Sequence, residues 1–303
     1  MAMPLVQFPE EYDKDISVRI FDGLAEQPNY YMDLFNISVV EDLNTNTTGY
    51  SGFGSMGQWP DGEPMPMDEA VSVFDSTITQ EFYGMGFAIT RKHLPHSMGG
   101  YGTGQLRLIQ GWADALARGV MQTYNTLGAA IFNNAFSTTY ASLGTVALCS
   151  ASHVTADGSN DRSNILASSA LTPANLETVI VLGANNTNYR GLRDPISYSK
   201  LVTGPSLRRT VAKILKSEGE MNTANNDANT QRDMFRPVMN PFISSTTAWF
   251  LQSETHGLPL LVGLPPQRKR FQDDDTETLV HGIATDFKFG VEFFEGVAGS
   301  QGA

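Results

Sequence analysis

The chain has 303 residues, of which 41% are hydrophobic and 17% charged, and this is the composition of a globular protein with a sizeable core. Its net charge of −12 argues against tight nucleic-acid binding by the whole surface, because a protein that grips DNA carries a basic stripe. A single cysteine, Cys149, excludes an internal disulfide and a multi-thiolate metal site, and no apolar run approaches the roughly 20 residues that span a bilayer.

The negative charge is concentrated near the N-terminus. Between Arg19 and Arg91 there is no lysine or arginine, whereas eleven aspartates and glutamates lie in this window. The rest of the chain holds 20 basic and 21 acidic residues (32 minus 11), so an acidic segment is joined to a nearly neutral body. The first residues, MAMPLVQFPEEYDKD, lack the basic start and apolar middle of a signal peptide. The residues up to about Val40 are compatible with a helix and an extended piece.

Residues 41–98 have no helical periodicity. Their second half, Ser72–Arg91, is rich in the β-branched and aromatic residues that are typical of strands. The stretch before it is rich in glycine and proline and has a clear turn at Pro60–Gly62. Loops of this length are uncommon inside a compact domain, and the aromatic residues argue against disorder. We therefore interpret residues 41–98 as an extended β-hairpin arm.

Three patterns suggest chemistry but lack the context that it needs. The G-x-G-x-x-G within Ser51–Gly57 has no apolar strand before it and no helix after it, as a dinucleotide site requires. His93 and His96 are separated by a proline and have no thiolate nearby, and residues 273–275 lack the spaced oxygens of a calcium loop. Cys149 lies in an apolar run and is interpreted as a buried small residue. We expect no catalytic residue, metal or cofactor.

The strongest helix prediction covers Gln105 to Phe136. Apolar residues recur there at intervals of three and four, at Ile109, Trp112, Leu116, Val120, Tyr124, Leu127 and Ile131. At about 1.5 Å per residue, some 30 residues make a rod of roughly 45 Å. A single helix of this length is typical of an elongated molecule, in which the helix supports the other elements along its length.

Beyond the long helix the pattern mixes helices and strands. Residues 142–153 predict a strand, and Thr172 followed by Pro173 predicts the start of a helix. A short strand leads into a helix at residues 204–218 that has basic residues on its outer face. Residues 235–253 predict two strands, and the alternating residues 278–294 predict a final half-buried strand. Because no regular βαβ repeat occurs, the sequence predicts an α+β fold.

An acidic arm without positive charge is attracted to a neutral or basic surface on another copy of the protein. A chain whose copies bury each other's arms is a subunit of an assembly. The residues that we expect at such contacts are Tyr50, Phe53, Trp59, Asp61, Glu63, Asp68 and Glu69 of the arm, Arg107 and Arg118 of the long helix, and Arg208 and Arg209 of the basic helix.

The order of these elements resembles the major capsid proteins of tailed bacteriophages, which share the HK-97 fold. Several stretches look like the Mu-type head-protein branch: the Trp59 loop before a hairpin that ends in AITR, NNAFSTTY before ALCSASH, LTPANLETVI, KLVTGPSLRRTVAKIL, AWFL, and the closing DFKFGVEFFEGVAGSQG. The resemblance covers nearly the whole chain and depends on the order and spacing of motifs that are individually weak.

The resemblance implies a division of the chain. It places an N-terminal arm at residues 1–40, an E-loop hairpin at 41–98, and the spine helix with the first part of the peripheral (P) domain at 99–170. The axial (A) domain follows at 171–276, and a C-terminal strand returns to the P domain at 277–303.

The resemblance also implies a function. The protein would be a non-enzymatic structural subunit whose hexamers and pentamers form an icosahedral shell around double-stranded DNA, without sequence-specific binding or membrane contact. It would be assembled in the host cytoplasm and reside in the virion. A portal and a separate scaffolding protein are expected partners, the latter because few residues precede the arm.

Some members of this fold join an E-loop lysine to a neighbour's asparagine, but this chain has no lysine between Lys14 and Lys92. Shell stability would then come from non-covalent contacts or from a decoration protein. Two alternatives to the phage capsid stay open at this point. One is an encapsulin-like nanocompartment with the same fold, and the other is a hydrolase-type enzyme with dispersed catalytic residues.

Overall fold

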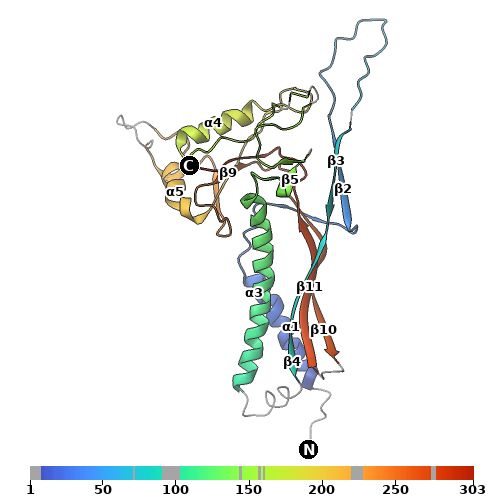
Figure 1. Cartoon of the computed structure of the whole chain (residues 1–303), viewed down its shortest axis with the longest axis vertical. Coiled ribbons are helices and arrows are strands. Elements are labelled where there is room, and N and C mark those ends of the chain that lie inside the picture. Colours follow the sequence, from blue (N-terminus) through green and yellow to red (C-terminus); the bar gives the residue numbers. More distant parts are fainter. Residues whose placement is uncertain are drawn as a thin grey trace, which may run out of the picture.

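The computed structural model describes residues 8–70, 72–90, 103–142, 145–155, 158–159, 161–219, 228–273 and 278–303. The molecule is elongated, with a long helix beside a long sheet, a second unit above them and a thin arm at one side (Figure 1). The predicted α+β class is confirmed. The histidine pair at His93 and His96, the expected end of the arm at Met98, and Asp274 and Asp275 lie outside the described residues.

The helices are α1 (Phe8–Glu26), α3 (Thr103–Asn133), α4 (Pro173–Ala184) and α5 (Arg208–Lys216), with single turns η1 (Thr138–Tyr140) and η3 (Pro205–Leu207). The strands are β1 (Asn36–Val39), β2 (Asn44–Tyr50), β3 (Ser72–Thr79), β4 (Glu81–Thr90), β5 (Ala141–Ser142), β6 (Val146–Ala147), β7 (Lys200–Thr203), β8 (Arg236–Met239), β9 (Trp249–Gln252), β10 (Pro259–Asp273), β11 (Thr278–Phe289) and β12 (Val297–Ser300). In the described part of the chain they form two four-stranded sheets, ordered β1-β10-β11-β4 and β12-β9-β7-β8, and the pairs β2-β3 and β5-β6.

The body consists of α3, α1 and the sheet β1-β10-β11-β4 (Figure 1). The predicted apolar stripe of α3 is buried at Ile109, Leu116, Val120, Tyr124 and Ile131. Tyr124 stacks on Phe287 of β11 with ring centroids 3.9 Å apart, and its hydroxyl lies 2.8 Å from that of Thr285. Trp112 departs from the prediction, because 39% of it is exposed. The long helix therefore braces the sheet along its length.

The apical unit consists of the sheet β12-β9-β7-β8 with α4 and α5 (Figure 1). The start of α4 is as predicted: the Thr172 hydroxyl accepts the Asn175 N–H at 3.2 Å, and Pro173 is the first helical residue. Helix α5 buries Val211, Ile214 and Leu215, which leaves its basic face outward. Trp249 of β9 is fully buried at the centre of this unit.

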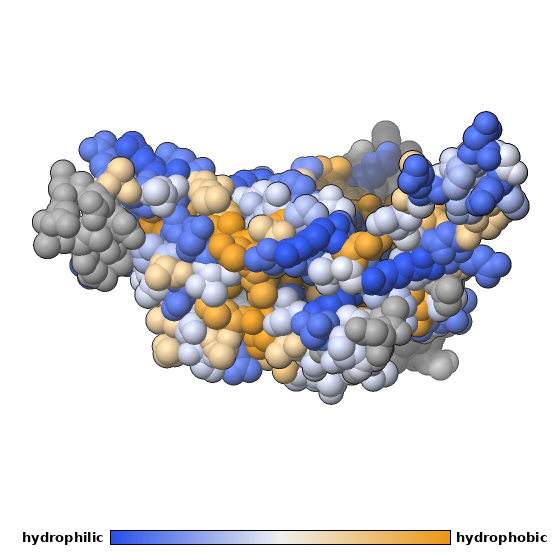
Figure 2. All heavy atoms as spheres, turned by 90° about the horizontal axis from the view of Figure 1, so that it is seen from above, coloured by the Kyte–Doolittle hydropathy of each residue, from blue (hydrophilic) through white to orange (hydrophobic). Residues whose placement is uncertain are grey.

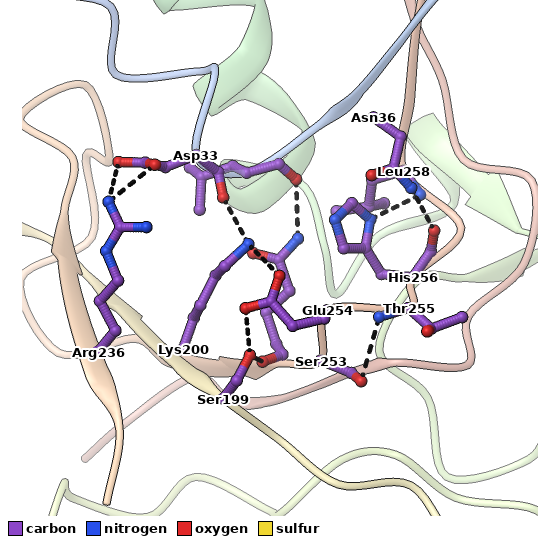
Figure 3. A network of polar contacts seen from close by, with 12 residues as sticks. Asp33, Asn36, Ser199, Lys200, Arg236, Ser253, Glu254, Thr255, His256 and Leu258 are labelled. Carbon is purple, nitrogen blue, oxygen red and sulfur yellow. Dashed lines mark hydrogen bonds and ion pairs between the residues drawn. The ribbon is translucent and has the colours of Figure 1, made fainter. Parts of the chain in front are cut away.

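A network of polar contacts joins the apical unit to the body (Figure 3). Arg236 of β8 donates to both carboxylate oxygens of Asp33 at 2.9 Å. The buried Lys200 of β7 donates to the Asp33 carbonyl at 3.0 Å and lies 3.4 Å from the Glu254 carboxylate. These contacts, made by residues far apart in the sequence, fix the orientation of the two parts of the molecule.

The boundaries of the parts differ from the predicted ones. The arm is the hairpin β2–β3 with its loop, Asn44–Thr79, whereas Glu81–Thr90 forms β4 and pairs with β11 along its length. Strand β10, which lies in the segment expected for the A domain, belongs to the sheet of the body, and the C-terminal β12 lies in the apical sheet. The body sheet collects strands from distant parts of the chain, and sequence order alone does not show this.

Two local predictions are also corrected. In its described residues the segment 142–153 is not one strand: Val146–Ala147 pairs with Ala141–Ser142, the chain then bends, and His153 forms an isolated bridge with Arg162. The final strand ends at Phe289, short of the predicted Phe294, and the next residue, Gly290, still donates its N–H to the Pro259 carbonyl of β10. Cys149 is buried as expected, and burial raises the pKa of its thiol. Of the helices in the described residues, none is both long and apolar enough to span a membrane.

Candidate functional site

The arm is held together by polar side chains. Strands β2 and β3 pair antiparallel, and most of their residues are at least partly open to solvent. Three threonine hydroxyls donate across the ladder at 2.7–2.8 Å, from Thr48 to Asp75, from Thr77 to Asn46 and from Thr79 to Asn44. Cross-strand pairs of this kind stabilise a two-stranded ribbon, which is marginal by itself. The polar sequence of the arm thus fits an element without a core of its own.

At the root of the arm, Gln80 between β3 and β4 joins the two legs of the hairpin. Gln80 is 4% exposed, its backbone N–H donates to the Leu43 carbonyl at 3.0 Å, and its side-chain amide donates to the Asp42 carbonyl at 3.0 Å. The Thr47 hydroxyl donates to the Glu292 carboxylate at 3.2 Å. The direction in which the strands leave the body is therefore defined.

Arg190 of the apical unit contacts both legs of the loop where they leave the strands. Its Nη1 donates to Asp68 Oδ2 at 2.6 Å, its Nε donates to the Ser51 hydroxyl at 3.3 Å, and its Nη2 donates to the Glu69 carbonyl. The Gly54 N–H donates to the same Asp68 oxygen at 2.6 Å. We call these five residues the clamp. The Gly54 N–H and the Arg190 guanidinium lower the pKa of Asp68, which keeps the carboxylate ionised.

A tight turn presents Arg190 to the loop. The side-chain oxygen of Asn188 accepts the N–H groups of Arg190 and Leu192, both at 3.0 Å. Gly191 has φ of +80°, a conformation that residues with a side chain rarely adopt. The turn is thus built locally, by an Asn–Tyr–Arg–Gly sequence that is suited to it.

Beyond the clamp, the loop exposes apolar residues to solvent. The exposed fractions are 67% for Phe53, 99% for Met56, 56% for Trp59, 59% for Met65 and 88% for Met67. The predicted turn at Pro60–Gly62 is present, with the Trp59 indole N–H donating to the Glu63 carbonyl at 2.6 Å. Seen from above, the loop projects at the right edge of the molecule, and apolar residues gather in the middle of the same face (Figure 2). Exposed apolar clusters of this kind mark surfaces that another protein covers.

The glycines of Ser51–Gly57 belong to one leg of this loop. Gly52 has φ of +69°, and a Cβ added to Gly54 would lie 3.2 Å from Asp68 Oδ2. The Gly54 backbone thus approaches a carboxylate of the same chain, and its N–H is used in the clamp.

A cavity of about 620 Å³ lies between the arm root, the Arg190 turn and the body. His153, 1% exposed, stacks on Phe294 with ring centroids 3.5 Å apart, and Arg162 lies 4.6 Å from the same ring while bonding to Glu295. Burial lowers the pKa of His153 to about 4, so the imidazole is neutral at pH 7. In the described residues no group of three or more His, Cys, Asp or Glu side chains could hold a metal ion.

Comparison with known proteins gives the family. A sequence model of a family described as "Phage capsid protein" matches residues 73–298, which is most of the chain. The chain belongs to this family. It is therefore a structural subunit of an icosahedral phage capsid, and its place is in the virion. Among curated protein sequences, none matches the chain.

Solved structures share the fold at low sequence identity. The mature capsid of bacteriophage PhiM1 has a TM-score of 0.55 at 10% identity, covering 91% of this chain and 88% of that one. A chain from Microbacterium phage Oxtober96 has 0.54 at 10%, covering 91% and 92%. The virus-like particle from Pyrococcus furiosus has 0.53 at 11%, covering 96% and 99%. The predicted HK-97-like fold is thus confirmed, whereas the Mu-type branch stays a prediction.

The predicted arm residues fall into two groups in this capsid subunit. Tyr50, Phe53, Trp59, Asp61 and Glu63 are exposed and open to contact by another copy. Asp68 contacts Arg190 of its own chain through its carboxylate, and Glu69 does so through its backbone carbonyl, while the contact of these two residues with another copy stays a prediction. The clamp thus uses part of the predicted contact set for an internal purpose.

The predicted basic surfaces are less uniform than expected. Arg118 is exposed on α3, but it lines a groove together with Asp22, Glu26 and Asp114, so the local charge is mixed. Arg208 and Arg209 are exposed on α5, which lies on the opposite side of the apical unit from the arm (Figure 1). The side chain of Arg107 lies outside the described part of the structure.

Arg190 is the residue of the clamp that the sequence did not reveal. Its turn has the asparagine and glycine of a tight bend, but nothing in the sequence indicates a partner 122 positions away. The available signal was the acidic, lysine-free and arginine-free arm itself, since such a segment attracts a cation from another part of the chain as well as from another copy.

Proposed function

We propose that this capsid subunit assembles into hexamers and pentamers and that its arm contacts another copy. The observation that carries the proposal is the loop beyond the clamp, whose five large apolar residues are more than half exposed. Exposing large apolar side chains to water is unfavourable in free energy. A contact with another copy buries them and is therefore favoured. An arm that contacts a different surface of the next copy makes a heterologous contact, and such contacts form a ring when the rotation between neighbouring copies closes.

The clamp supports the proposal by setting the direction of the loop. Arg190 holds both legs of the loop against the apical unit, so the exposed residues leave the molecule along one path. A pre-oriented arm loses less conformational freedom when it binds than a free one. The clamp thereby favours assembly although it contributes no contact to the neighbouring subunit.

The charge distribution supports the rest of the proposed role. A nearly neutral body can enclose double-stranded DNA without gripping it, and no sequence-specific binding is expected. The subunit acts as a structural component without enzymatic activity and assembles in the host cytoplasm. Since the arm has no lysine, the shell is held by non-covalent contacts or by a decoration protein, with a separate scaffolding protein and a portal as partners.

Electron microscopy of the purified protein, combined with a mass measurement, tests this function. Closed shells or capsomers of high mass are expected under assembly conditions. A hydrolase-type enzyme would instead run as a small oligomer. A discrete species of fewer than about ten subunits under all conditions would contradict the proposal.

A further inference from the structure

The cavity of about 620 Å³ at the root of the arm has the size of a ligand site. The arm runs beside one end of the apical unit here (Figure 1). The end of β2, the start of β3, the Arg190 turn and the residues around Phe294 all contribute to the lining. Sites for small molecules usually have volumes of about 300–1,000 Å³. The cavity is therefore large enough for an organic molecule of low mass.

The buried His153 brings no positive charge to the lining. The amide nitrogen of Asn164 donates to the carbonyls of Leu148 and Val297, at 2.7 and 2.8 Å, so the amide oxygen accepts. This oxygen lies 2.9 Å from Nε2 of His153, and Nε2 therefore carries the ring proton. Burial lowers the pKa of the ring to about 4, which leaves Nδ1 without a proton at pH 7. The ring thus has neither a charge nor a free N–H for an anionic ligand.

Arg162, the other basic residue in the described lining, is already bonded. Its guanidinium donates to the Glu295 carboxylate through Nη2 and to the Thr187 carbonyl through Nε, the latter at 2.8 Å. Only 5% of its side chain is exposed. Its charge is therefore used within the protein, and the cavity has no basic group for a phosphate or a carboxylate.

Two carboxylates in the lining keep unused acceptors. Asp194, which follows the Arg190 turn, is exposed, and within the described ranges no hydrogen bond or ion pair reaches its carboxylate. Oε1 of Glu295 bonds to Arg162, whereas no described group bonds to Oε2, and 27% of this side chain is open to solvent. Asp194 is therefore the uncompensated negative charge of the cavity.

The rest of the lining suits an apolar chain that carries a positive charge. Tyr50, Tyr189 and Phe293 contribute aromatic rings, and Val73 and Ile196 contribute aliphatic side chains. Aromatic rings attract ammonium groups electrostatically and also pack against alkyl chains. An alkylammonium ion meets both requirements, because its charged end donates to carboxylates and its stem is apolar.

We propose that this cavity binds a small aliphatic amine, such as a diamine, whose ammonium groups pair with the carboxylates of Asp194 and Glu295. Its alkyl chain packs against Tyr50 and Tyr189, which belong to the arm root and to the Arg190 turn. The ligand thereby contacts the arm and the apical unit at once, and it restrains the arm in addition to the clamp. The inference goes beyond the proposed function, since it concerns a site within one subunit and does not require a shell.

Isothermal titration calorimetry of the purified protein at low salt tests the inference, with the diamine cadaverine as the probe. One saturable site per subunit is expected. Glutarate, the dicarboxylate with the same carbon chain, is the ligand control and should not bind, because its charge is opposite.

Asp194→Asn keeps the shape of the side chain but removes its charge, and it should weaken cadaverine binding about tenfold. Glu177→Gln is the matched control, since Glu177 is an exposed carboxylate of α4 outside the cavity. Its affinity should equal that of the unaltered protein. Hydrogen exchange gives a second measurement: cadaverine should slow exchange at residues 49–51 in the unaltered protein, and less so in Asp194→Asn at the same concentration.

Three results would overturn the inference: no saturable binding of cadaverine, equal affinity of Asp194→Asn and the unaltered protein, or glutarate binding as tight as that of cadaverine. Saturable binding that leaves exchange at residues 49–51 unchanged would contradict the restraint of the arm. Because none of these measurements depends on assembly, each result leaves the proposed function standing.

Discussion

Arg190 and Asp68 are 122 positions apart in the sequence, and their side chains meet at 2.6 Å where the loop of the arm leaves its strands. Asp68 also accepts the Gly54 N–H from the other leg at 2.6 Å. The pair is partly exposed, with 21% of the Arg190 side chain and 47% of the Asp68 side chain open to solvent. Exposed ion pairs contribute about 0–1 kcal/mol to folding. The value of this pair therefore lies in the direction that it gives to the arm.

Replacing Arg190 by alanine is expected to reduce the yield of closed shells while leaving the subunit folded. The loop would keep its exposed residues but lose the contacts that fix both legs, and the unfolding free energy would fall by about 1 kcal/mol or less. Arg193→Ala is the matched control, since Arg193 lies in the same turn and donates to Asn185 at 2.6 Å. Negative-stain microscopy and thermal unfolding measure the two effects. Equal shell yields for both variants would contradict the role of the clamp.

Deleting Ser51–Pro60 is expected to leave a soluble subunit that forms no closed shells. Apart from Ser51 these residues are exposed, so their removal changes the melting temperature by only about 2 °C. Circular dichroism checks the fold, and light scattering with microscopy checks assembly. Intact shells from the deletion would remove the reason for describing this segment as an assembly arm.

Replacing Lys200 by methionine tests the junction between the apical unit and the body. Lys200 is 8% exposed and donates to the Asp33 carbonyl, which would lose a buried donor (Figure 3). The expected loss in unfolding free energy is about 1–3 kcal/mol. Lys216→Met is the control, because Lys216 pairs with Asp233 at the surface and should change stability by less than about 0.5 kcal/mol. Chemical denaturation gives both values, and a similar loss in the two variants would contradict the structural role of the junction.

Acidification is expected to destabilise the subunit through His256. Burial, followed by the charge of Lys200, lowers the pKa of this imidazole to about 4 in the folded chain. The unfolded chain binds the proton more tightly, with a pKa of about 6.5, so the stability that the neutral ring provides is complete above that pH. It is lost as the pH falls from 6.5 to 4, by roughly 2 kcal/mol at pH 5.

His256→Asn keeps an acceptor for the Leu258 N–H but removes the titrating group. The fall in melting temperature between pH 7 and pH 5 should therefore be smaller in this variant than in the unaltered protein. An unchanged pH slope would show that His256 is not the residue responsible.

Much of the fold follows from local patterns in the sequence. The period of the apolar residues predicts α3, and Thr172 with Pro173 predicts the start of α4, because a helix needs these features wherever it lies. The sequence does not predict strand β10, because Pro265 and Pro266 interrupt the alternation of apolar and polar residues that marks a strand. The structure accommodates them where the register with β11 shifts between Leu264 and Gln267.

Residues that meet across the fold could not be predicted. The arm can be recognised from the sequence, because its content of aromatic and acidic residues is unusual for a loop. The partners Arg190 and Asp68, or Lys200 and Asp33, become neighbours only through the arrangement of the two sheets. Local periodicity carries no information about such pairs.

A cryo-electron microscopy reconstruction of the assembled shell tests the central claim most directly. The account predicts density for residues 55–67, beyond the clamp, on the surface of a neighbouring subunit, with Arg190 and Asp68 of the same chain still in contact. A closed shell in which this loop contacts only its own subunit would contradict the account.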